Sequence, residues 1–348
     1  AQARDAGRKS ISGVDVWQLY DTYGFPVDLT RLMAEENGMA VDELEFLAEQ
    51  ERAKERSRAG RAGSASAADI KLNVHAIAEV DRMNVKKTDD SFKYGKEQIE
   101  AKIVALYTGS DFVRSVGNEA TIGVILDRTN FYAEAGGQEA DHGTLAIDGR
   151  SDFAVETVQA YGGYVVHIGY LKYGELSVGD TVVCTYDELR RWPLRNNHTG
   201  THILNFALAK VLGPAVDQKG SLVAPDKLRF DFTHKSPCTP AQLTEIERIC
   251  QELVARNVPV FSREVPLAVA KAINGLRAVF GEVYPDPVRV ISIGVPVEDL
   301  MADVGNPKWR ETSVEFCGGT LVAVSVPGAK KWSVNIVDSL TTFSVAQS

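Results

Sequence analysis

Residues 197–212 read NHTGTHILNFALAKVL, and this stretch decides how the chain around it is organised. Its apolar residues recur at the spacing of one helix face, which predicts a helix that buries that face. These residues are Ile203, Leu204, Ala207, Leu208 and Val211. His198 and His202 stand one turn apart at the start of the same helix, so both imidazoles project from one side. The stretch therefore predicts a core helix that begins with a pair of histidines.

The segments before and after this helix differ in their predicted secondary structure. Upstream, short β-rich runs are separated by Gly and Asp, which is typical of a small antiparallel barrel. The runs cover residues 101–107, 119–126, 143–147, 153–160, 164–169 and 181–185. Downstream, a strand pair, a helix at 239–257 and further strands and helices alternate as far as residue 326. Helices interleaved with antiparallel strands predict an α+β fold with layered packing.

The first 66 residues have a helical character of their own. Residues 14–32 predict two short helices around a Tyr23–Pro26 turn, and residues 41–58 predict a long surface helix. Small and Gly-rich residues then indicate a linker. The expected organisation is a helical part with linker (1–66), a connecting segment (67–118), a barrel (119–192), a layered α+β domain (193–326) and a divergent tail (327–348).

Composition narrows the class of protein. The chain has 348 residues, 44% hydrophobic and 24% charged side chains, and a net charge of −9, which excludes collagenous, coiled-coil and wholly disordered chains. The absence of a long apolar run predicts no membrane span. An acidic total argues against a globally basic nucleic-acid binder and against DNA as a partner, but leaves room for a local basic patch. Four cysteines without a CxxC pair fit a reducing, cytosol-like compartment.

Three residues form a candidate metal site. His198 and His202 reach one metal ion if both lie on one helix face, and Cys317 in the FCGGT segment at 316–320 offers a soft ligand on a Gly-rich turn. Alternatives stay open for each: the histidines bond to nearby carbonyls, or Cys317 is buried at a strand end. Together, two His and one Cys suit Zn²⁺ with an open position.

Two further segments carry polar groups. Residues 131–138 read FYAEAGGQ, in which Glu134 offers an acceptor and Gln138 an amide; the alternative is a plain hairpin connection. Arg190, Arg191 and Arg195 cluster beside the histidine helix. They are candidate contacts for RNA phosphates, and the alternative is a solvated basic turn.

These motifs, in this order, resemble the editing region of alanyl-tRNA synthetases and its free-standing relatives. The matching segments are FYAEAGGQ at 131–138, NHTGTH at 197–202, GSLV at 220–223, RFDF at 229–232 and FCGGT at 316–320. Upstream, LYDTYGFP at 19–26 resembles the end of the family's helical tRNA-recognition domain. We therefore expect an internal piece of a longer, cytoplasmic synthetase, with a mitochondrial form left open.

The resemblance implies an activity and the residues that perform it. The editing domain, of the type shared by threonyl- and alanyl-tRNA synthetases, hydrolyses serine or glycine esters on the acceptor end of tRNA(Ala). Zinc would be held by His198, His202 and Cys317. Gln138 would line the pocket, Thr201 would sense polar side chains, and Glu134 would accept a hydrogen bond from a ligand histidine. ATP would bind only to an aminoacylation domain that this chain does not contain.

The chain departs from the family at one ligand position. The family places its fourth zinc ligand, a histidine, where this sequence has Leu321. Two alternatives therefore stand beside the synthetase interpretation: a free-standing deacylase, which the segment at 19–26 disfavours, and a tRNA-binding module whose metal site has decayed, which Leu321 favours.

Overall fold

A computed structural model describes most of the chain. The described residues are 10–21, 30–31, 33–34, 37–42, 45–46, 70–95, 98–117, 121–279, 282–323, 332–337 and 342–347. The chain divides into two compact units, residues 1–66 and 67–348. Among the described residues, no helix has the length and apolar character that crossing a membrane requires.

The described residues of the first unit include a helix and a strand pair. Helix α2 (Gly13–Asp21) buries Val16, and β1 (Ser10–Ile11) pairs in parallel with β2 (Ala40–Val41). The expected turn at 23–26 and most of the expected 41–58 helix lie outside the described residues, as does the Gly-rich linker.

The second unit begins with α5 (Val74–Arg82) and the 3₁₀ helix η2 (Ser91–Tyr94), followed by a closed antiparallel barrel. The barrel confirms the expectation from the β-rich runs. Its strands are, in order around the barrel, β3 (Gln98–Tyr107), β6 (Thr121–Leu126), β9 (Tyr164–Tyr173), β8 (Ser151–Tyr161), β7 (Gly143–Ile147) and β11 (Thr181–Tyr186), and β11 returns to pair with β3. Because β3 closes the ring, the barrel begins before residue 119, where the sequence analysis placed its start.

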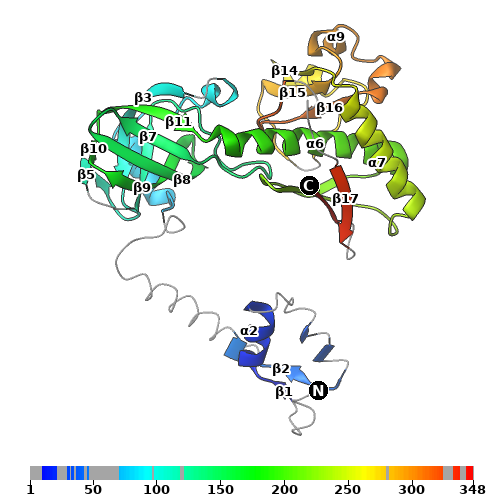
Figure 1. Ribbon diagram of the computed structural model, residues 1–348, viewed down its shortest axis with the longest axis horizontal. Coiled ribbons are helices and arrows are strands. Elements are labelled where there is room, and N and C mark those ends of the chain that lie inside the picture. Colours follow the sequence, from blue (N-terminus) through cyan, green and yellow to red (C-terminus); the bar gives the residue numbers. More distant parts are fainter. Residues whose placement is uncertain are drawn as a thin grey trace. The chain divides into compact units, whose positions relative to one another are not determined.

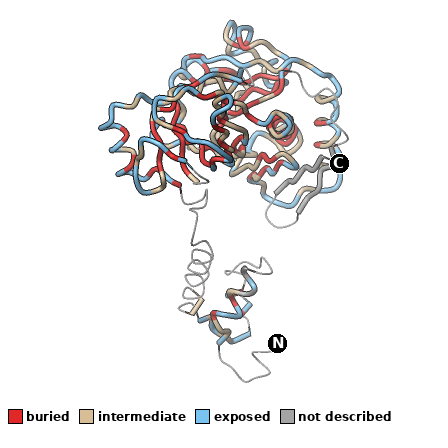
Figure 2. Tube along the Cα trace, turned by 60° about the vertical axis from the view of Figure 1, so that its left-hand side comes forward, coloured by how far each residue is buried: buried red, intermediate tan, exposed pale blue. Residues whose placement is uncertain are grey.

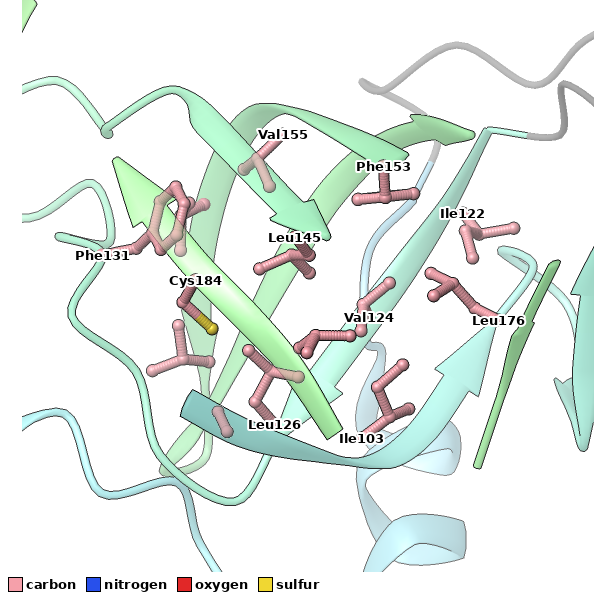
Figure 3. Close-up of a cluster of buried hydrophobic side chains, with 14 of the residues drawn as sticks. Ile103, Ile122, Val124, Leu126, Phe131, Leu145, Phe153, Val155, Leu176 and Cys184 are labelled. Atoms are coloured by element: carbon pink, nitrogen blue, oxygen red, sulfur yellow. The ribbon is translucent and has the colours of Figure 1, made fainter. Parts of the chain in front are cut away.

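Alternation along these strands fills the barrel with apolar side chains. Ile103, Val124, Leu145 and Phe153 all point into one interior cluster (Figure 3). Outward-facing residues of β3, β6 and β9 form a second cluster with α5, which buries Val80 completely. Three short strands lie outside the ring: β4 (Phe112–Val113), β5 (Ser115–Gly117) and β10 (Glu175–Ser177).

Helix α6 (Glu188–Leu212) connects the barrel to the rest of the unit (Figure 1). It starts nine residues earlier than the predicted 197, because Asp187 caps it by accepting hydrogen bonds from the backbone N–H groups of Leu189 and Arg190. Pro193 removes one backbone hydrogen bond but does not end the helix. Most residues between Arg191 and Leu208 are buried. Figure 2 shows buried residues, in red, throughout the interior of the second unit.

The region after α6 is layered. One sheet joins β12 (Gln218–Val223) and β13 (Lys227–Phe232) to β18 (Thr342–Gln347) and β17 (Trp332–Val337), so the expected divergent tail contributes two strands. A second sheet contains β14 (Val260–Val265), β15 (Val288–Ile293) and β16 (Ser313–Phe316). The helices are α7 (Pro240–Ala255), α8 (Leu267–Ala270), α9 (Val297–Ala302) and the 3₁₀ helix η3 (Pro307–Glu311). Helix α6 contacts both sheets and α7, as the expected mixture of strands and helices requires.

Candidate metal centre

Three candidate ligands come together from two segments. His198 and His202, one turn apart in α6, stack with ring centroids 5.2 Å apart and an interplanar angle of 19°. Cys317 directly follows β16. Their ligand atoms all lie within 4.8 Å of one another, and both histidines are buried. The group predicted from sequence is therefore assembled in the structure.

Hydrogen bonds orient both imidazoles towards Cys317. His198 Nδ1 lies 2.6 Å from Gln138 Oε1, and His202 Nδ1 lies 2.8 Å from Glu315 Oε2. Each Nε2 is left on the Cys317 side, with His198 Nε2 3.2 Å from the sulfur. His202 Nε2 is buried without a hydrogen-bond partner of good geometry among the described atoms, although it is close enough to the sulfur for electrostatic attraction. Metal-binding histidines are held in this way, with the second nitrogen fixed by an acceptor.

The charges of the group also suit a metal. Burial opposes ionisation of Cys317, but the two imidazoles hold the pKa of its thiol well below the ordinary value. Burial likewise opposes a charge on His202, but Glu315 and Cys317 raise the pKa of its imidazole to about 10. The lowered pKa of Cys317 favours its thiolate, which is the form of Cys that binds metal. A soft thiolate with two imidazoles fits Zn²⁺.

The turn after Cys317 requires a glycine at position 319. A Cβ on Gly319 would lie 2.0 Å from His198 Cε1, so only glycine allows the turn to reach the imidazole. Gly319 N–H donates to Cys317 Sγ at 3.2 Å. Arg289 Nη1 donates to the carbonyls of Cys317 and Gly319, at 2.9 Å each. The sulfur is therefore held in place by contacts on both sides of the turn.

Gln138 reaches the centre because its loop does more than connect two strands. Gly137 has a φ of +82°, and its carbonyl accepts a hydrogen bond from Val223 N–H at 2.7 Å. Gln138 is fully buried. Its Oε1 accepts from Thr320 N–H at 3.1 Å and its Nε2 donates to Thr320 Oγ1 at 2.8 Å. The barrel loop thereby ties His198 to the Cys317 turn.

Glu134 does not take the part expected of it. It is exposed and accepts a hydrogen bond from Gln159 Nε2 at 2.9 Å, while Gln138 and Glu315 are the acceptors for the histidines. Sequence reasoning missed Glu315. Its signal was position: residues 315 and 317, two apart at the end of a strand, project to the same face.

Thr201 lies in α6 beside the ligand histidines and is buried. Its hydroxyl donates to the Asn197 carbonyl at 3.0 Å, so its oxygen remains free to accept a hydrogen bond. Its predicted role in sensing polar side chains stays a prediction.

The arginine cluster does not form one solvent-facing patch. Arg191 is completely buried: it forms an ion pair with Asp141 and donates to the Asn130 and Lys93 carbonyls, at 2.7 Å and 3.0 Å. A tRNA phosphate cannot reach it, so this part of the prediction is corrected.

The other two arginines are more accessible but already have anionic partners. Arg190 pairs with Glu139 at 2.6 Å and Arg195 pairs with Glu188 at 2.7 Å. As contacts for tRNA, Arg190 and Arg195 stay predictions.

Residue 321 lies next to the metal group. The backbone N–H of Thr320 donates to Gln138, as above, and that of Val322 donates to Thr199 Oγ1 at 3.2 Å. Thr199 belongs to α6, between the ligand histidines. Leu321, half-buried, is thus held between two anchored neighbours.

Comparison with known proteins identifies the family. The family model described as "tRNA synthetases class II (A)" matches residues 1–190. Alanine--tRNA ligase of Candida albicans is 59% identical over 90% of this chain and 33% of its own length. The mitochondrial alanine--tRNA ligase of Saccharomyces cerevisiae is 53% identical, over 90% of this chain and 32% of its own length. The alanine--tRNA ligase of Schizosaccharomyces pombe is 51% identical, over 92% of this chain and 34% of its own length.

The chain spans about a third of the length of these relatives. The names of the matched relatives include cytoplasmic as well as mitochondrial forms. The family model covers more than half of the 348 residues, and the relatives match nearly the whole chain with high identity. The chain therefore belongs to the class II alanyl-tRNA synthetase family.

Proposed function

We propose that residues 67–348 form a zinc-dependent deacylase that removes serine or glycine from tRNA(Ala), within a cytoplasmic alanine–tRNA ligase. The observation that carries this proposal is the group of His198, His202 and Cys317, in which the buried Nε2 of His202 has no hydrogen-bond partner of good geometry among the described residues. ATP-dependent alanylation of tRNA(Ala) is then the work of the longer protein.

An alanine-specific synthetase has a physical need for such a site. A pocket that accepts alanine cannot exclude the smaller glycine, and one added hydroxyl, as in serine, changes binding only weakly. Discrimination of one small group is worth about 1–3 kcal/mol, so a second site that hydrolyses the wrong ester supplies the missing accuracy.

His198, His202 and Cys317 would hold the zinc, which when bound supplies Lewis-acid character or a fixed point for the amino acid. Gln138 and Glu315, which lie within hydrogen-bond distance of the two Nδ1 atoms, would keep both Nε2 atoms available to the zinc. Thr201, next to His202 in the sequence, offers its oxygen to the hydroxyl of a seryl ester. Because the two imidazoles are already oriented by hydrogen bonds, the proposed zinc site is preorganised.

The test is hydrolysis of aminoacylated tRNA(Ala) by the purified chain. Seryl and glycyl esters should be cleaved faster than the alanyl ester, and a zinc chelator should suppress the reaction. His202→Ala should remove most of the activity. His234→Ala is the matched control, because His234 is only half-buried and its hydrogen bond among the described residues is a local one, to the Ser236 carbonyl. Equal rates for the two variants would show that the three candidate ligands take no part in the hydrolysis.

The same preparation separates this proposal from a tRNA-binding module with a decayed metal site. Zinc at one equivalent per chain, lost in the His202→Ala variant, supports the enzyme. A chain that binds tRNA but retains no metal after dialysis against zinc-containing buffer supports the binding module.

A further inference from the structure

The partly exposed ring of Tyr94 lies beside the candidate metal ligands. Tyr94 ends η2 and comes from a segment far away in the sequence. Its hydroxyl donates to the Gly318 carbonyl at 2.8 Å, one residue from Cys317. Nevertheless 43% of Tyr94 remains exposed. The hydroxyl is therefore used inside the protein, whereas the ring stays partly exposed, with Lys93 Nζ 5.2 Å from its centroid.

A guanidinium group without an anionic partner lies against this ring. Arg289 Cζ is 4.1 Å from the Tyr94 ring centroid. Its Nη1 makes the two bonds to the Cys317 turn, whereas its Nε and Nη2 make no hydrogen bond within the described part of the chain. No described carboxylate pairs with Arg289, in contrast to Arg190 and Arg195, which both have one. Positive charge and several donors are thus left beside an exposed ring.

The segment that presents Tyr94 is fixed in position. The Lys93 carbonyl accepts a hydrogen bond from the buried Arg191 of α6 at 3.0 Å, and Lys93 Nζ pairs with Asp90 at 2.5 Å. Tyr94 is therefore anchored through its backbone neighbour and through its hydroxyl. A ring held in this way loses little conformational entropy when a ligand stacks on it.

We propose that Tyr94 and Arg289 form a platform for the terminal nucleotide of an RNA 3′ end. The base would stack on the exposed part of Tyr94, and the free donors of Arg289 would bind the adjoining phosphate. This inference rests on the proposed function, because it supplies the rim at which an aminoacylated 3′ end would enter the metal group. A mere clamp on the Cys317 turn would use only the Tyr94 hydroxyl and Arg289 Nη1.

The experiment measures binding rather than hydrolysis. The zinc-loaded chain is titrated with a fluorescent RNA hairpin that carries a single-stranded 3′ tail, and with the same hairpin lacking its terminal nucleotide. The wild type should bind the complete RNA about 5- to 150-fold more tightly, the range expected for one stacked base. Tyr94→Leu should abolish this difference, and Tyr94→Phe should restore it. Tyr173→Leu, at an exposed tyrosine of the barrel, should leave it unchanged.

Arg289→Gln tests the phosphate contact. It should weaken binding of both RNAs and reduce the slope of log affinity against log salt concentration by about one. An unchanged slope would overturn the assignment of Arg289.

Two results would overturn the platform. One is a wild type that does not distinguish the two RNAs. The other is a Tyr94→Leu variant that still distinguishes them, with weaker zinc binding in a chelator competition, which would make Tyr94 a clamp only. Failure of the wild type to hydrolyse seryl-tRNA(Ala) would instead refute the proposed function and leave the difference between the two RNAs intact.

Discussion

The substitution Leu321→His tests the proposed metal centre most directly. Zinc in proteins takes four ligands, and the described residues bring together three donors within 4.8 Å: two imidazoles and a thiolate. Residue 321 is flanked by backbone groups bonded to Gln138 at 3.1 Å and to Thr199 at 3.2 Å, so a new imidazole there starts from an ordered backbone. Only its own side-chain rotation has to be fixed on binding.

The expected gain in zinc affinity can be estimated from the known effect of removing a residue that orients a metal ligand. Removing a residue that merely orients a ligand lowers metal affinity about 10–100-fold. Adding a direct ligand should therefore raise zinc affinity by at least about tenfold, which corresponds to roughly 1.4 kcal/mol. Hydrolysis of the seryl ester should rise with metal occupancy at limiting zinc.

Competition against a chromogenic chelator measures both forms under identical conditions. Leu321→Phe is the matched control, because it places a flat ring at the same position without a ligand nitrogen. Equal chelator midpoints for the His and Phe variants would refute the reasoning. They would mean that the side chain of residue 321 does not face the three donors, or that these donors do not bind zinc.

Three further predictions concern packing, ligand orientation and pH. Gly319→Ala should lower the free energy of unfolding in urea by about 1–3 kcal/mol and weaken zinc binding in the chelator assay, because its Cβ would lie 2.0 Å from His198 Cε1. Gly318→Ala should change neither quantity, because no atom lies within 4 Å of its Cβ. Glu315→Gln should lower zinc affinity about 10–100-fold in the chelator assay without unfolding the chain; an unchanged affinity would contradict its orienting role. Burial lowers the pKa of His167 to about 4, below the 6.5 of an unfolded histidine, so the unfolded chain binds the proton first as pH falls. The free energy of unfolding in urea should therefore fall by about 3 kcal/mol from this residue between pH 6.5 and 4, and by less in His167→Asn.

The sequence predicted the ligands because their chemistry is local. His198 and His202 are one helical turn apart, and Cys317 stands on a glycine turn that only a close approach explains. The barrel followed from alternation and spacing, since six strands with polar connections have few other ways to bury one face. That β3 belongs to the ring could not be predicted in the same way, because the pairing of β3 with β11 joins segments about 80 residues apart.

Features that depend on distant partners could not be predicted. The charge of Arg191 indicated a surface position, but its Asp141 partner lies 50 residues away and compensates the charge inside the protein. The helix was expected to start at residue 197, but the cap at Asp187 and the burial of the following residues outweigh the one hydrogen bond lost at Pro193. Glu134 and Gln138 were equivalent as candidates from sequence, and only the turn at Gly137 distinguishes the outward side chain from the inward one.

Helix α6 has a consequence for how this part of the protein unfolds. Its 25 residues span roughly 38 Å at ~1.5 Å per residue. Its first half is fixed to the barrel by polar contacts, and its second half belongs to the hydrophobic core of the layered region. Arg191 is buried against barrel residues, whereas Ile203 and Leu208 pack with β13 and α7. Unfolding either the barrel or the layered region would remove the contacts of half of α6, and the turns of a helix form cooperatively. The barrel and the layered region should therefore denature in a single calorimetric transition, and a cut between residues 192 and 193 would destabilise both halves.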